Sequence, residues 1–509
     1  MTDSKEDLTR LLASDADPVE AGVILKRLSE QESPDVTGWL STLANHRSDL
    51  SLADPAVLGG LIRLIHLTVL RDQDGLLGQL SLPDLTAVLH GLPESTPNRH
   101  LLMHLLAMRG DADSLTALVS HLRQSPPRGW MAAGQILSPL MQRDQWPIEA
   151  VFPRLLDLLD QPALASPVLD LAGYLVRSGR LSEHPAADRV ESINHLLAAV
   201  ADRLARFEED PRSFGDEVDQ VQAVLSEAVA LAVSLCDAAA LIGEPSSLPA
   251  LYKAVDLKHR RVQSEAAGAM AKLGDEAGRE RLIELADEPS ARLRAIHYAD
   301  ELGFGNRINP SNRTPESTAE AELALWLSQP QQMGVPPTEV EVVDSRRMLW
   351  PSFHDPVDVY LVRFEYRFGE RCFSNIGMTG PAVFSFSADV ADLPVDDIYA
   401  MYAGWHAEHP DIFTVRAQDF NDAQLRRVEP LSLHLHRNGY SDVHAELLGF
   451  FLDETAAVFR ALRDGKECLA ITDGLETIDI ATAGRQRPVS PEDVFHLYKG
   501  RKMLRTFNS

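Results

Sequence analysis

Two consecutive stretches decide the fold of the first part of this chain: LYKAVDLKHRRVQSEAAGAMAKLGD at residues 251–275 and LIELADEPSARLRAIHYADELGF at residues 282–304. At an offset of 31 residues they share apolar and acidic positions, which pair as Leu251 with Leu282, Asp256 with Asp287 and Val262 with Leu293. In each stretch one helix ends, an Asp and a short turn reverse the chain, and small Ala residues let the second helix pack closely on the first. One such pair cannot bury its own apolar face, so we expect the pairs to stack.

The same pattern extends towards the N-terminus. In an earlier copy at residues 155–179, the positions 2, 12 and 15 residues after Asp160 hold Pro, Ala and Leu, as do those after Asp287. From the first residues to about Gly305, apolar residues recur at spacings of three and four, and Pro, Gly or Asp interrupts them every 10 to 18 residues. This pattern predicts 14 to 16 amphipathic helices, several of them opened by a capping side chain before Pro, as at Asp17-Pro18, Ser33-Pro34 and Asp54-Pro55.

These stretches resemble the HEAT-repeat superfamily, in particular the short HEAT-like repeats first described in phycobilisome lyase subunits. The resemblance covers residues 245–305 best and 145–180 less closely, and the turn arginine of the repeat is matched by Arg294 but replaced by Gln263 one copy earlier. It implies an α-solenoid with a curved inner surface that commonly binds another protein. It does not imply lyase activity, because the repeat occurs in many unrelated proteins. Residues 183–241 depart from the pattern with two long helices, which we interpret as an irregular or inserted repeat.

Charge and aromatic content add two constraints. The chain has 75 acidic and 48 basic residues, a formal charge of -27, which opposes sequence-independent binding to nucleic acid or anionic lipid. Of the 32 Phe, Trp and Tyr residues, 9 fall in residues 1–300 and 23 in residues 301–509. The uneven distribution of large rings indicates two unlike architectures in one chain.

The cysteines and the start of the chain indicate the compartment. Cys236, Cys372 and Cys468 are far apart and odd in number, so we expect neither a disulfide framework nor a structural zinc site. The first ten residues carry mixed charge without an apolar run, so we expect no secretory signal.

No membrane span is expected either. The most apolar windows, residues 55–70 and 224–243, are interrupted by Arg63 in the first and by Glu227 and Asp237 in the second. These observations together predict a cytoplasmic protein.

The composition changes after residue 305. Residues 306–318, NRINPSNRTPEST, form the expected linker, and residues 315–327 the expected connecting helix. Alternating apolar and polar residues then predict strands at 340–343, 357–368, 372–376, 382–387, 443–451, 467–472 and 477–481. Hairpin turns are expected at Asp464-Gly465 and Asp473-Gly474. This order predicts an antiparallel sheet with helices on one face.

Three helices are expected to accompany the strands. One covers residues 394–409 and carries Asp396 and Asp397 in its first turn, a second covers about 422–438, and the last begins after the capping residue Ser490. The fold class we predict is therefore mainly α: a HEAT-like α-solenoid at 1–305, a linker and connecting helix at 306–335, and an α+β module at 336–509. The module is either one domain or two small subdomains that divide near 413–422.

Histidines offer weak candidates for a metal site. His406 and His409 are three residues apart and share a helix face, but zincin chemistry needs a spacing of four with Glu next to the first His. His434 and His436 would share a face only in a strand, and the surrounding leucines favour a helix. We therefore predict no metal and no cofactor.

No catalytic constellation is present in the sequence. The loop-like segment at 374–381, SNIGMTGP, is not followed by a helix or a Lys, so we interpret it as a turn between strands and not as a phosphate cradle. The aromatic residues Tyr399, Tyr402 and Trp405 are expected to fill a core, with a pocket lining as the alternative.

A basic run near the end of the chain gives the candidate binding residues Lys499, Arg501, Lys502 and Arg505. Cations in the last turns of a helix are expected from the helix dipole alone, and contact with an acidic surface of the same or another chain is the alternative.

The function we predict is a non-catalytic scaffold: the solenoid binds a partner protein and the C-terminal module adds specificity. Neither nucleic acid nor membrane is an expected partner. The alternative is an enzyme or small-ligand-binding protein whose site lies in the C-terminal module, with the solenoid positioning a protein substrate. A chromophore-lyase accessory role would depend on the resemblance alone.

Overall fold

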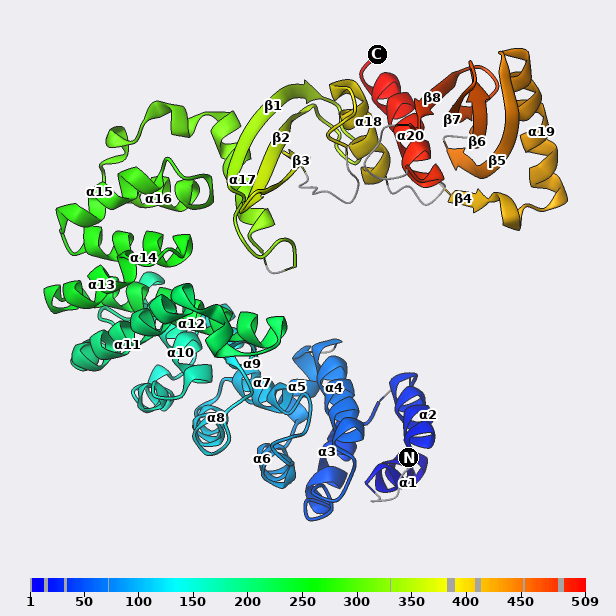
Figure 1. The fold of residues 1–509 in the computed structure, drawn as a ribbon. Coiled ribbons are helices and arrows are strands. Elements are labelled where there is room, and N and C mark those ends of the chain that lie inside the picture. Colours follow the sequence, from blue (N-terminus) through cyan, green and yellow to red (C-terminus); the bar gives the residue numbers. More distant parts are fainter. Residues whose placement is uncertain are drawn as a thin grey trace. The chain divides into compact units, whose positions relative to one another are not determined.

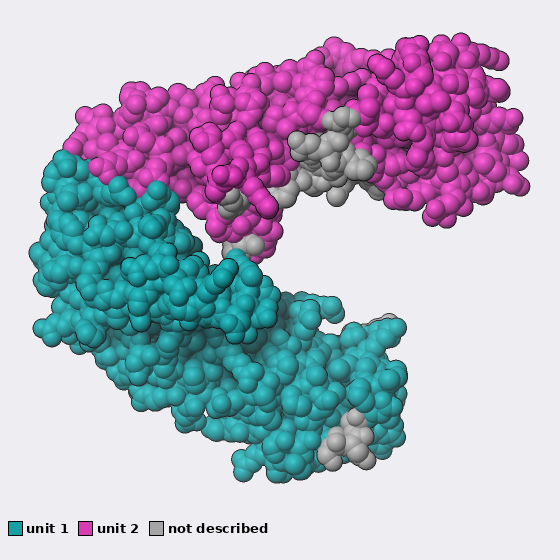
Figure 2. All heavy atoms as spheres, viewed as in Figure 1, with its two compact units in different colours: residues 1–282 teal, residues 283–509 magenta. Residues whose placement is uncertain are grey.

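A computed structural model describes residues 2–12, 17–31, 34–71, 73–329, 331–381, 390–407, 413–451, 454–483 and 489–509. These residues form two compact units, residues 1–282 and residues 283–509, which Figure 2 shows in different colours. The division lies inside one helix, α15 (Glu276–Leu285). The boundaries expected at residues 305 and 335 are a different division of the chain, and they stay a prediction.

Unit 1 is entirely helical (Figure 1) over the residues described. Its helices are α1 (Thr2–Leu11), α2 (Pro18–Ser29), α3 (Val36–Asn45), α4 (Pro55–Arg71), α5 (Gln73–Gln79), α6 (Leu82–Gly91), α7 (His100–Arg109), α8 (Ala112–Gln124), α9 (Trp130–Gln142), α10 (Pro162–Arg177), α11 (Val190–Glu209), α12 (Val218–Ile242), α13 (Leu248–Val255), α14 (Arg260–Lys272) and the first part of α15, with the 3-10 helices η1 (Ile148–Ala150), η2 (Arg154–Leu158), η3 (Ala187–Arg189), η4 (Pro211–Phe214) and η5 (Pro245–Ser247).

The helices of unit 1 stack in two layers. The second layer consists of α2, α4, α7, α9, α10, α12 and α14, and each of these contacts the next. The first layer contains α1, α3, α6, α8, the short helices η1 and η2, α11 and α13, which alternate along the chain with the second. The predicted α-solenoid of stacked pairs is confirmed, and the sixteen α-helices described up to Glu301 match the expected number.

Local signals in the sequence set the helix starts. Asp17 and Asp54 precede α2 and α4, and their carboxylates accept hydrogen bonds from the amides of Val19 (3.0 Å) and Ala56 (2.7 Å). Each satisfies one of the amide groups that a helix start leaves without a partner. The cap expected at Ser33 lies outside the described residues.

The irregular segment forms the long antiparallel pair α11 and α12, as predicted. Within the described part of the chain, α12 is the one helix long and apolar enough to cross a membrane, so Glu227 and Asp237 do not exclude a span by composition. Half of its most apolar stretch is buried inside the protein, and the helix contacts α10, α11 and α14. This is the environment of a core helix.

The repeat turn has a polar side chain at the fourth position of its second helix. Gln263, the fourth residue of α14, donates to the Val255 carbonyl (3.2 Å) at the end of α13. The fourth residue of α16 (Pro289–Glu301) is Arg292, which donates in the same way to the Ala286 carbonyl (3.1 Å). The counterpart of Gln263 is therefore Arg292, and the expected Arg294 is wrong, because the offset between copies falls from 31 to 29 residues across the turn.

Unit 2 contains two antiparallel sheets and the helices between and around them. Its elements are the rest of α15, α16, η6 (Gly305–Arg307), η7 (Pro310–Arg313), α17 (Pro315–Leu327), β1 (Glu339–Met348), β2 (Val357–Phe368), β3 (Arg371–Thr379), α18 (Val395–His406), β4 (Phe413–Arg416), η8 (Ala417–Asp419), α19 (Asp422–Arg437), β5 (Tyr440–Phe451), β6 (Glu454–Arg463), β7 (Lys466–Thr472), β8 (Thr477–Ala481) and α20 (Pro491–Phe507).

The three-stranded sheet has the order β1-β2-β3 and lies between α17 and α18 (Figure 1). Alternate residues of β2 point to opposite faces: Val362 and Phe364 pack with Leu323 of α17, whereas Leu361 packs with Tyr402 of α18. The expected connecting helix α17 thus covers one face of the sheet, and it also contacts α16.

The five-stranded sheet has the order β4-β5-β6-β7-β8 and lies between α20 and α19. Val458 of β6 packs with Phe495 of α20, and its neighbour Phe459 packs with Leu435 of α19. The expectation of one sheet with helices on one face is therefore wrong in detail: the described residues form two sheets, and each has a helix on both faces. The antiparallel α+β character of the module is confirmed.

Helices α18 and α20 lie against each other and connect the two sheets. They approach backbone to backbone at two glycines: a Cβ on Gly500 would overlap the carbonyl oxygen of Ala400, and one on Gly404 would overlap that of His496. Small residues are what permit so close a crossing.

Candidate functional site

Helix α20 positions the predicted binding residues. Its start is fixed by a capping box in which Ser490 accepts from the amide of Asp493 (3.2 Å) and Asp493 accepts from the amide of Ser490 (3.3 Å). The apolar face of the helix packs into the core of unit 2 through Val494, Phe495 and Tyr498. The cations of the sequence run are therefore held on a rigid element.

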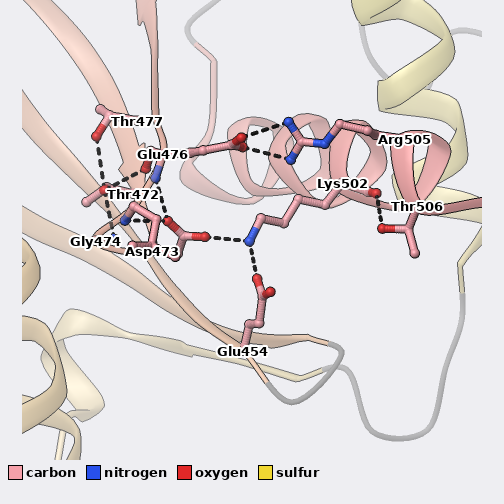
Figure 3. Close-up of polar contacts among 10 residues, drawn as sticks. Glu454, Thr472, Asp473, Gly474, Glu476, Thr477, Lys502, Arg505 and Thr506 are labelled. Atoms are coloured by element: carbon pink, nitrogen blue, oxygen red, sulfur yellow. Dashed lines mark hydrogen bonds and ion pairs between the residues drawn. The ribbon is translucent and has the colours of Figure 1, made fainter. Parts of the chain in front are cut away.

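Lys502 lies between two carboxylates that come from different parts of the five-stranded sheet (Figure 3). Its ammonium donates to Glu454 at the start of β6 and to Asp473 in the turn after β7. The Lys502 side chain is 13% exposed and that of Asp473 is 6% exposed, so this ion pair is largely shielded from water.

Asp473 also organises the turn between β7 and β8. One of its oxygens accepts from the amides of Leu475 (2.9 Å) and Glu476 (2.8 Å). Burial opposes ionisation of this carboxyl, but the hydrogen bonds from Lys502 and from the turn amides hold its pKa well below the ordinary value. Burial, and then the neighbouring Asp473 carboxylate, raise the pKa of Tyr498.

Two further cations of the run also have carboxylate partners in unit 2. Arg505 donates to both oxygens of Glu476 (2.7 and 2.9 Å), as Figure 3 shows, and Arg501 donates to Asp397 on α18 (2.8 Å). Arg501, Lys502 and Arg505 are thus neutralised by acids of the same unit. A role of these residues in binding a partner stays a prediction.

Lys499 differs from its three neighbours. Its side chain is buried, and no hydrogen bond or ion pair reaches its ammonium from the residues the structure describes. Burial lowers the pKa of Lys499 to about 8. The nearby His496 is partly buried, and this burial lowers its pKa to about 4.

A cavity of about 420 Å³ lies beside the Lys502 ion pairs, where α19, the start of β6 and the β7–β8 turn meet. The residues that line it combine charged, polar and apolar groups: Arg427, Leu431, Glu454, Thr455, Asp473 and Leu475. This is the candidate ligand site of unit 2.

Arg427 is the functional candidate that reasoning from the sequence missed. It lies on α19, donates to the Thr455 hydroxyl (3.1 Å) and has its guanidinium 5.4 Å from the centre of the Phe450 ring. No carboxylate pairs with it among the described residues. In the sequence it is one of two adjacent arginines on an amphipathic helix, so only the three-dimensional position of β6 and of the turn could have distinguished it.

The histidine candidates show no metal site within the described part of the chain. His406 accepts a hydrogen bond from the Trp350 indole on Nδ1 (2.8 Å). His409 lies outside the described residues. His434 and His436 lie on α19, a helix as expected, where they hydrogen-bond to Asn438 and to the Tyr440 carbonyl.

Residues 374–381 and the aromatic and acidic residues of α18 have structural roles. Most of residues 374–381 belongs to β3 and is not a turn, which corrects the expectation for that segment. Tyr399 and Tyr402 fill the core beside the three-stranded sheet, as expected. Asp396 pairs with Arg346 (2.7 Å), so the two acids at the start of α18 both have arginine partners.

Comparison with known families agrees with the helical architecture. A family model described as HEAT repeats matches residues 220–300, the region from α12 to α16. This part of the chain therefore consists of HEAT repeats, a class of module that generally mediates protein interactions. Neither the curated proteins nor the solved structures contain a match to the chain.

Proposed function

We propose that the protein is a non-catalytic scaffold whose solenoid binds a partner protein and whose C-terminal module adds specificity. The observation that carries this proposal is the HEAT-repeat match at residues 220–300, whose first part, up to residue 282, belongs to the stacked helices of unit 1. Repeats of this kind present one extended layer of helices, which suits a protein partner better than a small substrate.

Exposed apolar side chains support the second layer as the binding surface. Large apolar residues that are 40% exposed or more occur on its helices α2, α4, α9 and α12: Val19, Val23, Leu67, Met131 and Val218. Aliphatic groups that a solenoid leaves in water are candidates for burial in a complex.

We also propose that the scaffold acts in the cytoplasm. All three cysteines are free, and Cys372 is exposed, which suits a reducing compartment.

The test is affinity capture from the native lysate with the full chain and two variants. Val23→Glu combined with Met131→Glu is expected to lose a stoichiometric partner that the unchanged chain recovers. The control is Leu52→Glu, which makes the same change at a 66% exposed position in the turn before α4. Equal recovery with both variants would exclude the second layer, and recovery of no stoichiometric protein at all would contradict the scaffold role.

A further inference from the structure

The cavity beside α19 has an uneven distribution of unpaired charge. Its two acids are already engaged, because Glu454 and Asp473 share the Lys502 ammonium and Asp473 also accepts from two turn amides. The remaining charged group in the lining is Arg427, which has no carboxylate partner among the residues described. The group in this cavity that lacks a counter-ion is therefore a cation.

The position of the Arg427 guanidinium is fixed from two sides. The Thr455 hydroxyl accepts one of its N–H groups at 3.1 Å, and the Phe450 ring lies 5.4 Å from the guanidinium carbon. Phe450 is itself stacked on Phe413, with ring centres 4.4 Å apart. A guanidinium held in this way keeps other N–H groups for a ligand and loses little side-chain freedom when it binds one.

The rest of the lining is apolar on one side. Leu431 is buried against the sheet, whereas Leu475 in the β7–β8 turn is 89% exposed. So large an exposed aliphatic side chain at a cavity gains from contact with an apolar ligand group.

We propose that this cavity binds a carboxylate attached to a small aliphatic group, with Arg427 pairing with the carboxylate and Leu431 and Leu475 contacting the aliphatic part. Two sources have this chemistry: a free short-chain carboxylic acid, and the C-terminal carboxylate of a peptide that ends in an aliphatic residue. The inference goes beyond the scaffold role and does not depend on it.

The test is calorimetric titration of the full chain with matched probes. N-acetyl-leucine and 4-methylpentanoate carry the carboxylate, and N-acetyl-leucinamide has the same aliphatic body without the charge. The two acids are expected to bind at least roughly tenfold more tightly than the amide, since a charge-assisted pair with Arg contributes about that factor. A hexapeptide ending in Leu, with a free or an amidated C-terminus, distinguishes the sources: tighter binding of the free hexapeptide than of both small acids assigns the site to a peptide C-terminus.

Three variants make the assignment specific. Arg427→Gln is expected to weaken acid binding roughly tenfold or more, and Arg427→Lys to weaken it less, because the charge stays but the planar fork is lost. Arg426→Gln removes the same charge from the neighbouring residue of α19, which does not line the cavity, and is expected to bind as the unchanged chain does. Melting temperatures of the variants show that each is folded.

The proposal is overturned if the amide binds as tightly as the acids, if Arg427→Gln and Arg426→Gln bind alike, or if no probe binds. Glu454→Gln tests the sign of the ligand's charge. Because this variant removes a carboxylate from the lining, it is expected to strengthen binding of the carboxylate probes about two- to threefold. Weaker binding in that variant would show that the ligand group is not an anion.

Discussion

Lys502 belongs to a basic run in the sequence, but in the structure it forms ion pairs within unit 2. In the sequence it belongs to four cations within seven residues, from Lys499 to Arg505, in a strongly acidic chain. In the structure it is largely shielded between Glu454 and Asp473. Within unit 2 it compensates carboxylates that folding brings together.

Replacement of this cation is expected to destabilise unit 2. Lys502→Met leaves the Asp473 carboxylate, 6% exposed, without its ammonium partner, and should reduce the free energy of unfolding by about 2–4 kcal/mol. Urea denaturation measures the change. Addition of Asp473→Asn to this variant should recover part of the loss, because the uncompensated charge is removed.

The control for this prediction is Arg505→Gln. Arg505 and its partner Glu476 are 60% and 47% exposed, and such a surface pair contributes at most about 1 kcal/mol. Equal losses in the two variants would mean that burial does not determine the contribution of the Lys502 pair.

The sequence predicts the helix N-caps but not the residues that line the cavity beside α19. Asp17, Asp54 and Ser490 act on amides two or three residues away, so their roles can be read locally. Arg427 and Thr455 are 28 residues apart and meet only because β6 pairs between β5 and β7. No local pattern encodes that contact.

Strand β6 is a whole element that the local sequence pattern does not predict. Its sequence, ETAAVFRALR, has no alternation, because the strand is central and Ala456, Ala457, Val458 and Phe459 are all buried, on both faces of the sheet. Alternation of apolar and polar residues marks a strand with one solvent-exposed face. Strand β8 has this alternation, and its predicted bounds are the observed ones. The short edge strand β4 was missed because four residues carry too little pattern.

The α18–α20 crossing gives a prediction for a helix pair. In Gly500→Ala the new Cβ would overlap the backbone oxygen of Ala400, which cannot move like a flexible side chain, so the helices must separate. We expect the free energy of unfolding to fall by about 2–3 kcal/mol. Chemical denaturation checks the value.

Gly134→Ala is the matched control. Gly134 is also inside a helix, α9, but an added Cβ there meets nothing within 4 Å. This variant should gain about 0.5–1 kcal/mol from helix propensity. A loss as large as that of Gly500→Ala would show that glycine replacement in a helix is destabilising here irrespective of packing.

For the whole molecule, the sequence predicted two architectures and the general order of elements. The repeat period identified the solenoid because each helix pair repeats a local pattern. The two sheets were merged into one because sheet membership depends on which distant strands pair. The strand expected at residues 382–387 lies outside the described residues.

Acid is expected to loosen unit 1 through two pairs of histidines, in which His66 and His121 are buried and His104 is partly buried. His66 and His104 hydrogen-bond to each other between α4 and α7 (3.0 Å), and the rings of His90 and His121 lie 4.5 Å apart between α6 and α8. Burial lowers the pKa of His104 and that of His121 from 6.5 to about 4. Their neutral forms therefore stabilise the unit fully above pH 6.5, and this stabilisation is lost as the pH falls from 6.5 towards 4.

Hydrogen exchange measures this effect locally. Peptides from α7 and α8 should lose protection between pH 7 and pH 5, after correction for the intrinsic exchange rate. The double variant His104→Gln and His121→Gln should reduce the pH dependence of the protection free energy by roughly one bound proton per histidine. Replacement of the exposed His195 by Gln should leave this pH dependence unchanged. An unchanged slope in the double variant would contradict the assignment to these rings.

The position of α20 between the two sheets has a consequence for synthesis. Every strand that the structure describes in unit 2 precedes residues 491–507 in the chain, and yet both sheets bury an apolar face against the layer that α20 forms with α18. The Arg501–Asp397 contact alone spans 104 residues. During synthesis, therefore, strands that have already emerged keep this apolar surface uncovered until the late helix α20 is made, and they are open to non-native association during that interval.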